Sequence, residues 1–153
     1  MKQILLITFA CLLSCKAQKE GQSISGEEMK DLVLIAQDHY SGILEYDTQV
    51  IKDAKSLHKF YAQINKTRKP GLPVPVIDFS KETVIVICMG QQKGEIEPKL
   101  SKTEESESNI IIAVELLKNN DFKKDVNASI FHSFYVYKIP NTSKKIDFQK
   151  LGW

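Results

Sequence analysis

The chain contains few of the residues that mark unusual protein classes. Its 153 residues include only 7 glycines and 5 prolines, which excludes a fibrous or a largely disordered protein. The formal net charge is only +2, and because the basic residues are spread along the chain, a nucleic-acid-binding surface is not expected. With 42% hydrophobic residues, the chain can build the core of one ordinary domain.

An apolar run at the N-terminus is too short for a transmembrane helix. Residues 4–13 are almost purely apolar and follow the positive charge of Lys2. A helix that spans a bilayer needs about 20 such residues. A short apolar stretch behind a positive charge is typical of a secretory signal peptide.

The residues at the end of this run resemble the lipobox of bacterial lipoproteins, with Leu12, Leu13 and Ser14 preceding Cys15. The resemblance implies that residues 1–14 are a signal peptide and that Cys15 is acylated after cleavage. Because two or more acyl chains attach a protein stably to a membrane, we expect lipid anchoring in the bacterial cell envelope. The alternative is a plain secretory signal in which Cys15 has no special role.

The residue that follows the lipobox indicates in which membrane the lipoprotein is expected. In enterobacterial lipoproteins an Asp after the acylated Cys implies retention at the inner membrane, so Lys16 implies the outer membrane. Residues 15–26 are rich in Gln, Ser and Gly, which is typical of a flexible tether. Residues 27–153 are then expected to form a single domain.

Hydrophobic patterning predicts an α+β domain with the element order ββαββββ. Apolar residues alternate along 30–40 and 44–50, which predicts two strands. Residues 57–64 repeat at helical spacing, with Asp53 as the predicted N-cap. Four further strands are predicted at 83–89, 95–100, 109–117 and 130–139. Short connections favour antiparallel neighbours, so we expect one helix packed on a mostly antiparallel sheet.

Two of these strands carry a specific expectation about their position in the sheet. The β-branched run of residues 83–89 predicts a central strand that is buried on both faces. Pro98 lacks a backbone N–H group, which predicts that the strand around it lies at an edge.

Local signatures of catalysis or of metal or cofactor binding do not occur in the sequence. His39, His58 and His132 are far apart in the chain, so each is predicted to be a surface or a hydrogen-bonded histidine rather than a metal ligand. Once Cys15 is acylated and residues 1–14 are removed, Cys88 is the only free thiol. Its apolar neighbours predict a buried, inert residue rather than a nucleophile. We therefore predict no catalytic residue, no metal and no cofactor.

Residues 76–90 resemble part of the C-terminal domain of the protease-complex subunit PrcB. Asp78-Phe79-Ser80-Lys81 precedes an apolar strand that ends in Gly90, and the order of elements is similar over residues 30–140. Taken by themselves, Asp78 and Ser80 suit a turn and Phe79 suits the core. The resemblance implies a non-enzymatic accessory module that binds an envelope protease or another secreted protein.

The loop after Gly90 differs from the loop of that family. The family often has a Pro-Thr-Gly-Gly-Tyr type loop, whereas this chain has Gln91, Gln92, Lys93, Gly94 and Glu95, without an aromatic anchor. We predict that these five residues, together with the edge around Pro98, bind the partner. Two alternatives remain open. One is a hydrolase or thiol enzyme that uses His132, Cys88 or a carboxylate, and the other is a binder of a small apolar ligand between helix and sheet.

Overall fold

The computed structural model describes residues 26–117 and 129–153. The described residues form ten strands and one helix, and most neighbouring strands are antiparallel, so the α+β prediction is confirmed. The strands are β1 (Glu27–Glu28), β2 (Val33–Asp38), β3 (Tyr46–Ile51), β4 (Glu82–Met89), β5 (Gln92–Lys93), β6 (Glu97–Glu105), β7 (Asn109–Leu117), β8 (Ile130–Phe131), β9 (Phe134–Pro140) and β10 (Lys145–Leu151), and the helix is α1 (Ala54–Ile64).

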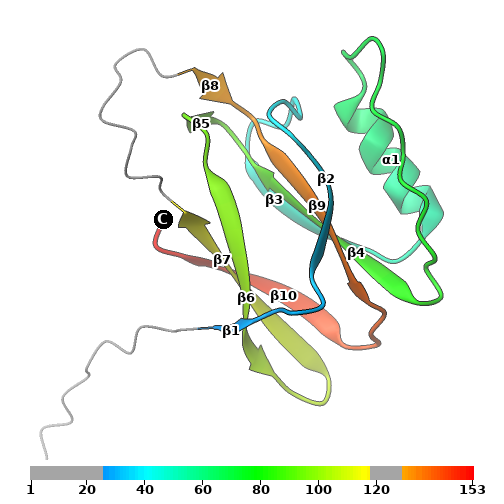
Figure 1. Ribbon diagram of the computed structural model, residues 1–153, viewed down its shortest axis with the longest axis vertical. Coiled ribbons are helices and arrows are strands. Elements are labelled where there is room, and N and C mark those ends of the chain that lie inside the picture. The colour runs from blue at the N-terminus through cyan, green and yellow to red at the C-terminus, as the bar shows by residue number, and fades with distance from the viewer. Residues whose placement is uncertain (1–25, 118–128) are drawn as a thin grey trace, which may run out of the picture.

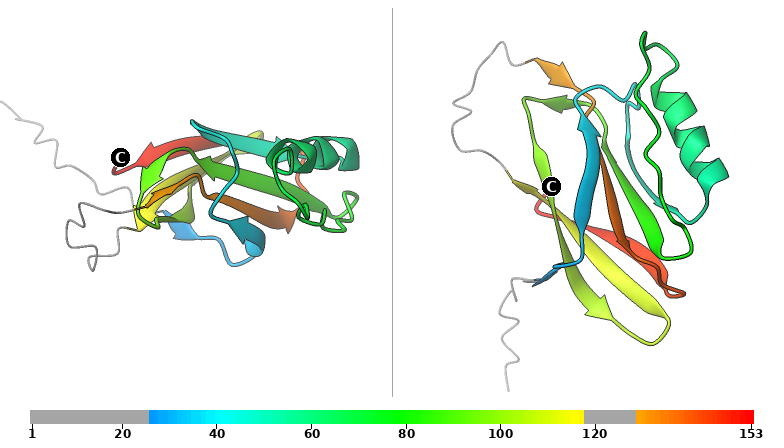
Figure 2. Two further views of the ribbon diagram at one scale, coloured as in Figure 1. Left: turned by 90° about the horizontal axis from the view of Figure 1, so that it is seen from above. Right: turned by 45° about the vertical axis from the view of Figure 1, so that its right-hand side comes forward.

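The helix and two four-stranded sheets are stacked in three layers (Figure 1). The middle layer is a sheet with the strand order β2-β9-β4-β3, and α1 covers one of its faces. A second sheet, with the order β1-β6-β7-β10, packs on the other face. Figure 2 shows these layers from two further directions. The short strands β5 and β8 form a separate two-stranded sheet at one end of the molecule.

The central strand β4 contributes to both hydrophobic cores. Because successive side chains of a strand point to opposite faces, one set packs under α1 and the other set packs against the second sheet. The first set consists of Val84, Val86 and Cys88, and the second of Ile85, Ile87 and Met89. Since all six are buried, the prediction of a central strand buried on both faces is confirmed.

Helix α1 begins where the sequence predicts. The Asp53 carboxylate accepts a hydrogen bond of 2.8 Å from the backbone N–H of Ser56, which caps the first turn. The side chains that face the sheet recur at helical spacing and are buried, namely Leu57, Phe60, Tyr61 and Ile64. The helix has 11 residues, and no helix in the described ranges combines the length and apolar character needed to cross a bilayer.

The turn that precedes β4 follows its local prediction. The Asp78 carboxylate accepts hydrogen bonds from the backbone N–H and the hydroxyl of Ser80, while Phe79 packs against the core beneath α1. These contacts explain the Asp-Phe-Ser sequence by local structure alone.

The predicted strand order misses the last strand. No strand was predicted after residue 139, but β10 pairs in parallel with β7, from Lys145 opposite Asn109 to Leu151 opposite Glu115. Ile146 and Phe148 alternate with polar residues, but this pattern is short and does not identify the partner strand. The chain between β7 and β10 includes β8 and β9, so it is long enough for the connection that a parallel pair needs.

The strand around Pro98 is an edge over only part of its length. β1 covers β6 at Ser101 and Lys102, whereas β6 at Pro98 is paired only with β7, opposite Leu116. The prediction of an edge strand is therefore correct for the part of β6 that contains Pro98. β6 also extends to Glu105, five residues beyond the predicted end.

Candidate binding surface

Three connections meet at the end of the molecule that carries β5 and β8 (Figure 1). They are residues 39–44 between β2 and β3, residues 90–95 around β5, and residues 129–133 around β8, and together we call them the loop end. Backbone hydrogen bonds join them: the N–H of Ser41 donates to the carbonyl of His132 (2.8 Å), and the N–H of His132 donates to the carbonyl of His39 (3.0 Å). Segments that are distant in the sequence therefore form one surface.

The five predicted contact residues belong to this surface, but they do not form an open loop. Gln92 and Lys93 are β5, which pairs with Phe131 and Ile130 of β8. The N–H of Gln91 donates to the carbonyl of Leu44 (2.9 Å), and the N–H of Gly94 donates to the carbonyl of Ser129 (3.0 Å). The expectation of a simple loop is thus corrected, because partners elsewhere in the chain fix the backbone of this segment.

Apolar side chains surround the segment and are exposed to solvent. Tyr40 is 51% exposed, Leu44 is 65% exposed and Ile130 is 54% exposed. Exposed large apolar side chains that gather on one surface are typical of interaction sites. The aromatic group that the loop itself lacks is therefore supplied by Tyr40, from a connection about 50 residues earlier in the chain.

Charged side chains hold the connection after β2 in place. Arg68 donates hydrogen bonds to the Asp38 carboxylate and to the carbonyl of Tyr40. Although partial burial alone would raise the pKa of Asp38, the hydrogen bonds from Arg68 and from the Tyr40 amide lower it below its usual value. Glu95 lies 3.6 Å from the Nε2 atom of His39, which links the predicted contact segment to the same connection.

The histidines only partly follow their prediction. His39 is exposed and lies beside Glu95, and His58 donates from Nδ1 to the carbonyl of Ala54 at 2.7 Å. His132 contradicts the prediction, because both of its ring nitrogens are buried without a hydrogen-bond partner among the described residues. Pairing between distant segments fixes its position: the His132 backbone is bonded to His39 and Ser41, and its ring lies edge-on to the Tyr40 ring, with 5.7 Å between the ring centroids. Nowhere in residues 26–117 and 129–153 do three potential metal-binding side chains gather.

Comparisons of the chain with family models, curated proteins and solved structures gave no match. The resemblance of residues 76–90 to the PrcB domain therefore stays a prediction. The predicted signal peptide, the predicted acylation site Cys15 and the predicted tether up to residue 25 lie outside the described residues.

Cys88 is part of the hydrophobic core rather than of a surface site. Its side chain is fully buried under α1, as its apolar neighbours predict. Burial raises the pKa of the Cys88 thiol to about 12, and the negative charge of Asp47 adds to this shift. Because the thiolate is the reactive form of cysteine, the folded protein holds this group in an inert state.

We expect Cys88 to resist thiol reagents in the native protein. When a variant that lacks Cys11 and Cys15 is treated with an aromatic disulfide reagent at pH 8, labelling of Cys88 should be negligible over hours. In concentrated urea the protein unfolds and Cys88 becomes accessible, so the absorbance of the released aromatic thiolate should correspond to one thiol per chain. Labelling of the native protein within minutes would contradict this assignment and would favour a reactive-thiol function.

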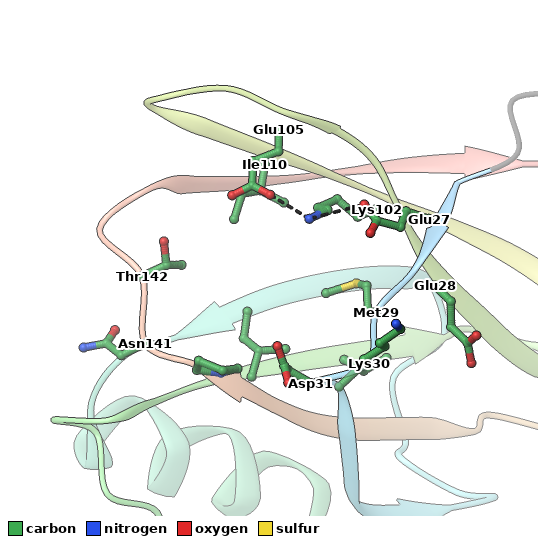
Figure 3. A pocket seen from close by; sticks show the side chains of 13 residues that line it. Glu27, Glu28, Met29, Lys30, Asp31, Lys102, Glu105, Ile110, Asn141 and Thr142 are labelled. Atoms are coloured by element: carbon green, nitrogen blue, oxygen red, sulfur yellow. Dashed lines mark hydrogen bonds and ion pairs between the residues drawn. The ribbon is translucent and has the colours of Figure 1, made fainter.

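A groove of about 410 Å³ lies at the opposite end of the sandwich, where β1 and the residues before β10 meet β6 (Figure 3). Lys102 pairs with two carboxylates that line it: the Lys102 Nζ atom lies 2.7 Å from Glu105 and 3.6 Å from Glu27. Lys144 also reaches Glu105, at 2.6 Å. Hydrogen bonds from these two lysines lower the pKa of Glu105 to about 2. The paired charges connect β1, β6 and the start of β10, which indicates a structural role.

Proposed function

We propose that this protein is a non-enzymatic, lipid-anchored binding or accessory module of the bacterial cell envelope. Its loop end would bind an envelope protease or another secreted protein. One observation carries the proposal: Tyr40, Leu44 and Ile130 are exposed around the predicted contact segment of residues 91–95. Exposed aromatic and aliphatic side chains of this kind supply much of the binding energy in protein interfaces.

The fixed backbone of the contact segment supports the same proposal. Binding costs free energy when loops must be ordered on association. Here the backbone bonds of Gln91 to Leu44 and of Gly94 to Ser129 already hold the segment in one conformation. A partner would therefore meet a surface that is largely ordered before contact.

The described chain begins at the end of β6 that is remote from the loop end. β1 runs antiparallel to β6, with Glu27 opposite Lys102 and Glu28 opposite Ser101. Residue 26, the first described residue, therefore lies toward the Glu105 end of β6, whereas the loop end lies beyond the Glu97 end. Attachment of an anchor through residue 26 would leave the loop end accessible to a partner.

Removal of the exposed apolar groups tests the proposed contact. The full lipoprotein, tagged at its C-terminus, is crosslinked in its native host, and the captured envelope protease or secreted protein is quantified. Combined Tyr40→Ala and Leu44→Ala substitutions should lower capture by about tenfold or more, since each removes an interface anchor. Leu34→Ala is the matched control, because Leu34 is 45% exposed but lies on β2, outside the loop end. Equal capture by the double variant and the control would refute the proposed surface.

The lipid anchor has a separate test. In Cys15→Ala the acyl acceptor is lost, so the protein should move from the membrane fraction to the aqueous fraction after cell disruption. Ser23→Ala provides a control within the predicted tether and should remain with the membrane. If the Cys15→Ala protein stays membrane-bound at the level of the unaltered protein, anchoring through this residue is wrong.

A further inference from the structure

The two four-stranded sheets have four edge strands, and three of them are protected against a further strand. β1 has only two residues, β2 is interrupted by an irregularity between Leu34 and Ala36, and β10 carries charged side chains along its length. Short length, bulges and charges are the devices by which proteins protect sheet edges. The part of β6 that β1 leaves uncovered contains Pro98, which protects it in the same way.

The edge of β3 has none of these features. Its six residues pair with β4 in an unbroken register from Tyr46 opposite Met89 to Ile51 opposite Val84. The strand contains no proline, and its only charged residue is Asp47, near its start. In an antiparallel pair, every second residue of an edge strand directs its backbone N–H and C=O groups away from its neighbour. β3 therefore offers free hydrogen-bonding groups to a further strand.

A groove of about 450 Å³ runs along this edge, between β3 and α1. Gln49, Val50 and Ile51 line it on the strand side. The helix side is formed by Ser56, Lys59, Phe60 and Gln63. An open strand edge beside a helix is the arrangement in which several peptide-binding domains add an extended segment to their sheet.

The charges beside the groove favour an acidic ligand. α1 carries Lys55 and Lys59 and no acidic residue. Within the described parts of the chain, neither lysine takes part in an ion pair. The nearby Asp53 carboxylate is engaged in capping the helix through Ser56. On the strand side, the Asp47 carboxylate accepts a hydrogen bond of 2.7 Å from the side chain of Gln49. Lys59 lines the groove without an ion pair, so its charge is available to a ligand.

We propose that the groove between β3 and α1 binds an extended acidic segment of a partner protein by adding it as a strand to β3. Backbone hydrogen bonds to β3 would supply affinity that does not depend on sequence. A carboxylate of the segment would meet Lys59, and alternate side chains would lie toward Ile51 and Phe60. This surface is separate from the loop end, so the inference goes beyond the proposed function and does not depend on it.

Synthetic peptides test the proposal directly on the full chain. The probe is a short fluorescein-labelled peptide in which valine alternates with glutamate, and fluorescence anisotropy measures its binding. We expect saturable binding that Lys59→Glu weakens by about tenfold or more, because it reverses the charge beside the ligand. Lys99→Glu is the matched control: Lys99 is an exposed lysine on β6, in the other sheet, and its reversal should leave binding within about twofold.

A change in the peptide tests strand addition without affecting the fold. The same peptide with N-methyl groups on alternate amides cannot donate those hydrogen bonds, so its binding should be lost. Hydrogen exchange should also slow at alternate amides of β3 when the unmodified peptide is bound. The proposal is overturned if the N-methylated or a valine–lysine peptide binds equally well, or if protection appears outside β3 and α1. Self-association of the chain through β3 without peptide binding would also overturn it, since a second copy would then occupy the edge.

Discussion

Gly90→Ala should destabilise the protein by at least about 3 kcal/mol. Gly90 has φ +68°, a conformation that costs a residue with a side chain about 1–2 kcal/mol. A Cβ atom at this position would also lie 2.7 Å from the backbone nitrogen of Tyr46 and 2.8 Å from the carbonyl carbon of Glu45. Both atoms belong to the backbone at the start of β3, so the clash cannot be relieved by turning a side chain.

Urea unfolding followed by Trp153 fluorescence measures this effect. Trp153 is the single tryptophan of the chain, and its ring packs edge-on against Tyr46 at 4.5 Å. Gly42→Ala is the matched control, because Gly42 has nearly the same φ of +70° but no atom within 4 Å of the added Cβ. The control should lose only about 1 kcal/mol. Equal losses in the two variants would mean that the close approach at Gly90 has no energetic consequence.

Ile87→Ala should destabilise the protein by about 3–4 kcal/mol. Ile87 is fully buried in the middle of β4, where it packs in the core between the two sheets. Truncation removes apolar contacts from both layers and leaves a cavity, because the backbone of β4 is held by β3 on one side and by β9 on the other. The same urea titration gives the difference in free energy of unfolding.

Ile130→Ala is the matched control, because it removes the same side-chain atoms from an isoleucine that is exposed rather than buried. Ile130 is 54% exposed on β8, so its truncation should change the free energy of unfolding by less than about 0.5 kcal/mol. On the proposed function, the same substitution should weaken partner capture. A large loss of stability in Ile130→Ala, or a negligible loss in Ile87→Ala, would show that the layers are packed differently.

Local patterns predicted most of the elements because the residues that define them are close in sequence. The spacing of Leu57, Phe60, Tyr61 and Ile64 defines the buried face of α1, and Asp53 reaches its capping partner only three residues away. The run of residues 83–89 is apolar on both faces because β4 has a packed layer on each side. β10 was not predicted, although Ile146 and Phe148 alternate with polar residues, because so short a pattern does not reveal parallel pairing with the distant strand β7.

Only part of the candidate surface could be predicted from the sequence. The segment of residues 91–95 could be proposed from the resemblance to the PrcB domain, because it stands where that family often has a Pro-Thr-Gly-Gly-Tyr type loop. Its apolar neighbours could not be proposed, since Tyr40 and Ile130 are joined to the segment only through pairing between distant strands. The groove beside β3 could not be predicted from the sequence either, because whether a strand lies at an edge depends on the order of strands in the sheet.

The sequence by itself determined the α+β class, the helix with its cap, the central strand and the buried position of Cys88. These features depend on hydrophobic periodicity and on hydrogen bonds between residues close in the chain. Only the tertiary structure decided which strands are neighbours, which edge stays open, and that Tyr40, Leu44 and Ile130 share one surface with residues 91–95. The physical reason is that strand pairing joins backbone groups far apart in the chain, and such pairing leaves no periodic signal in either partner alone.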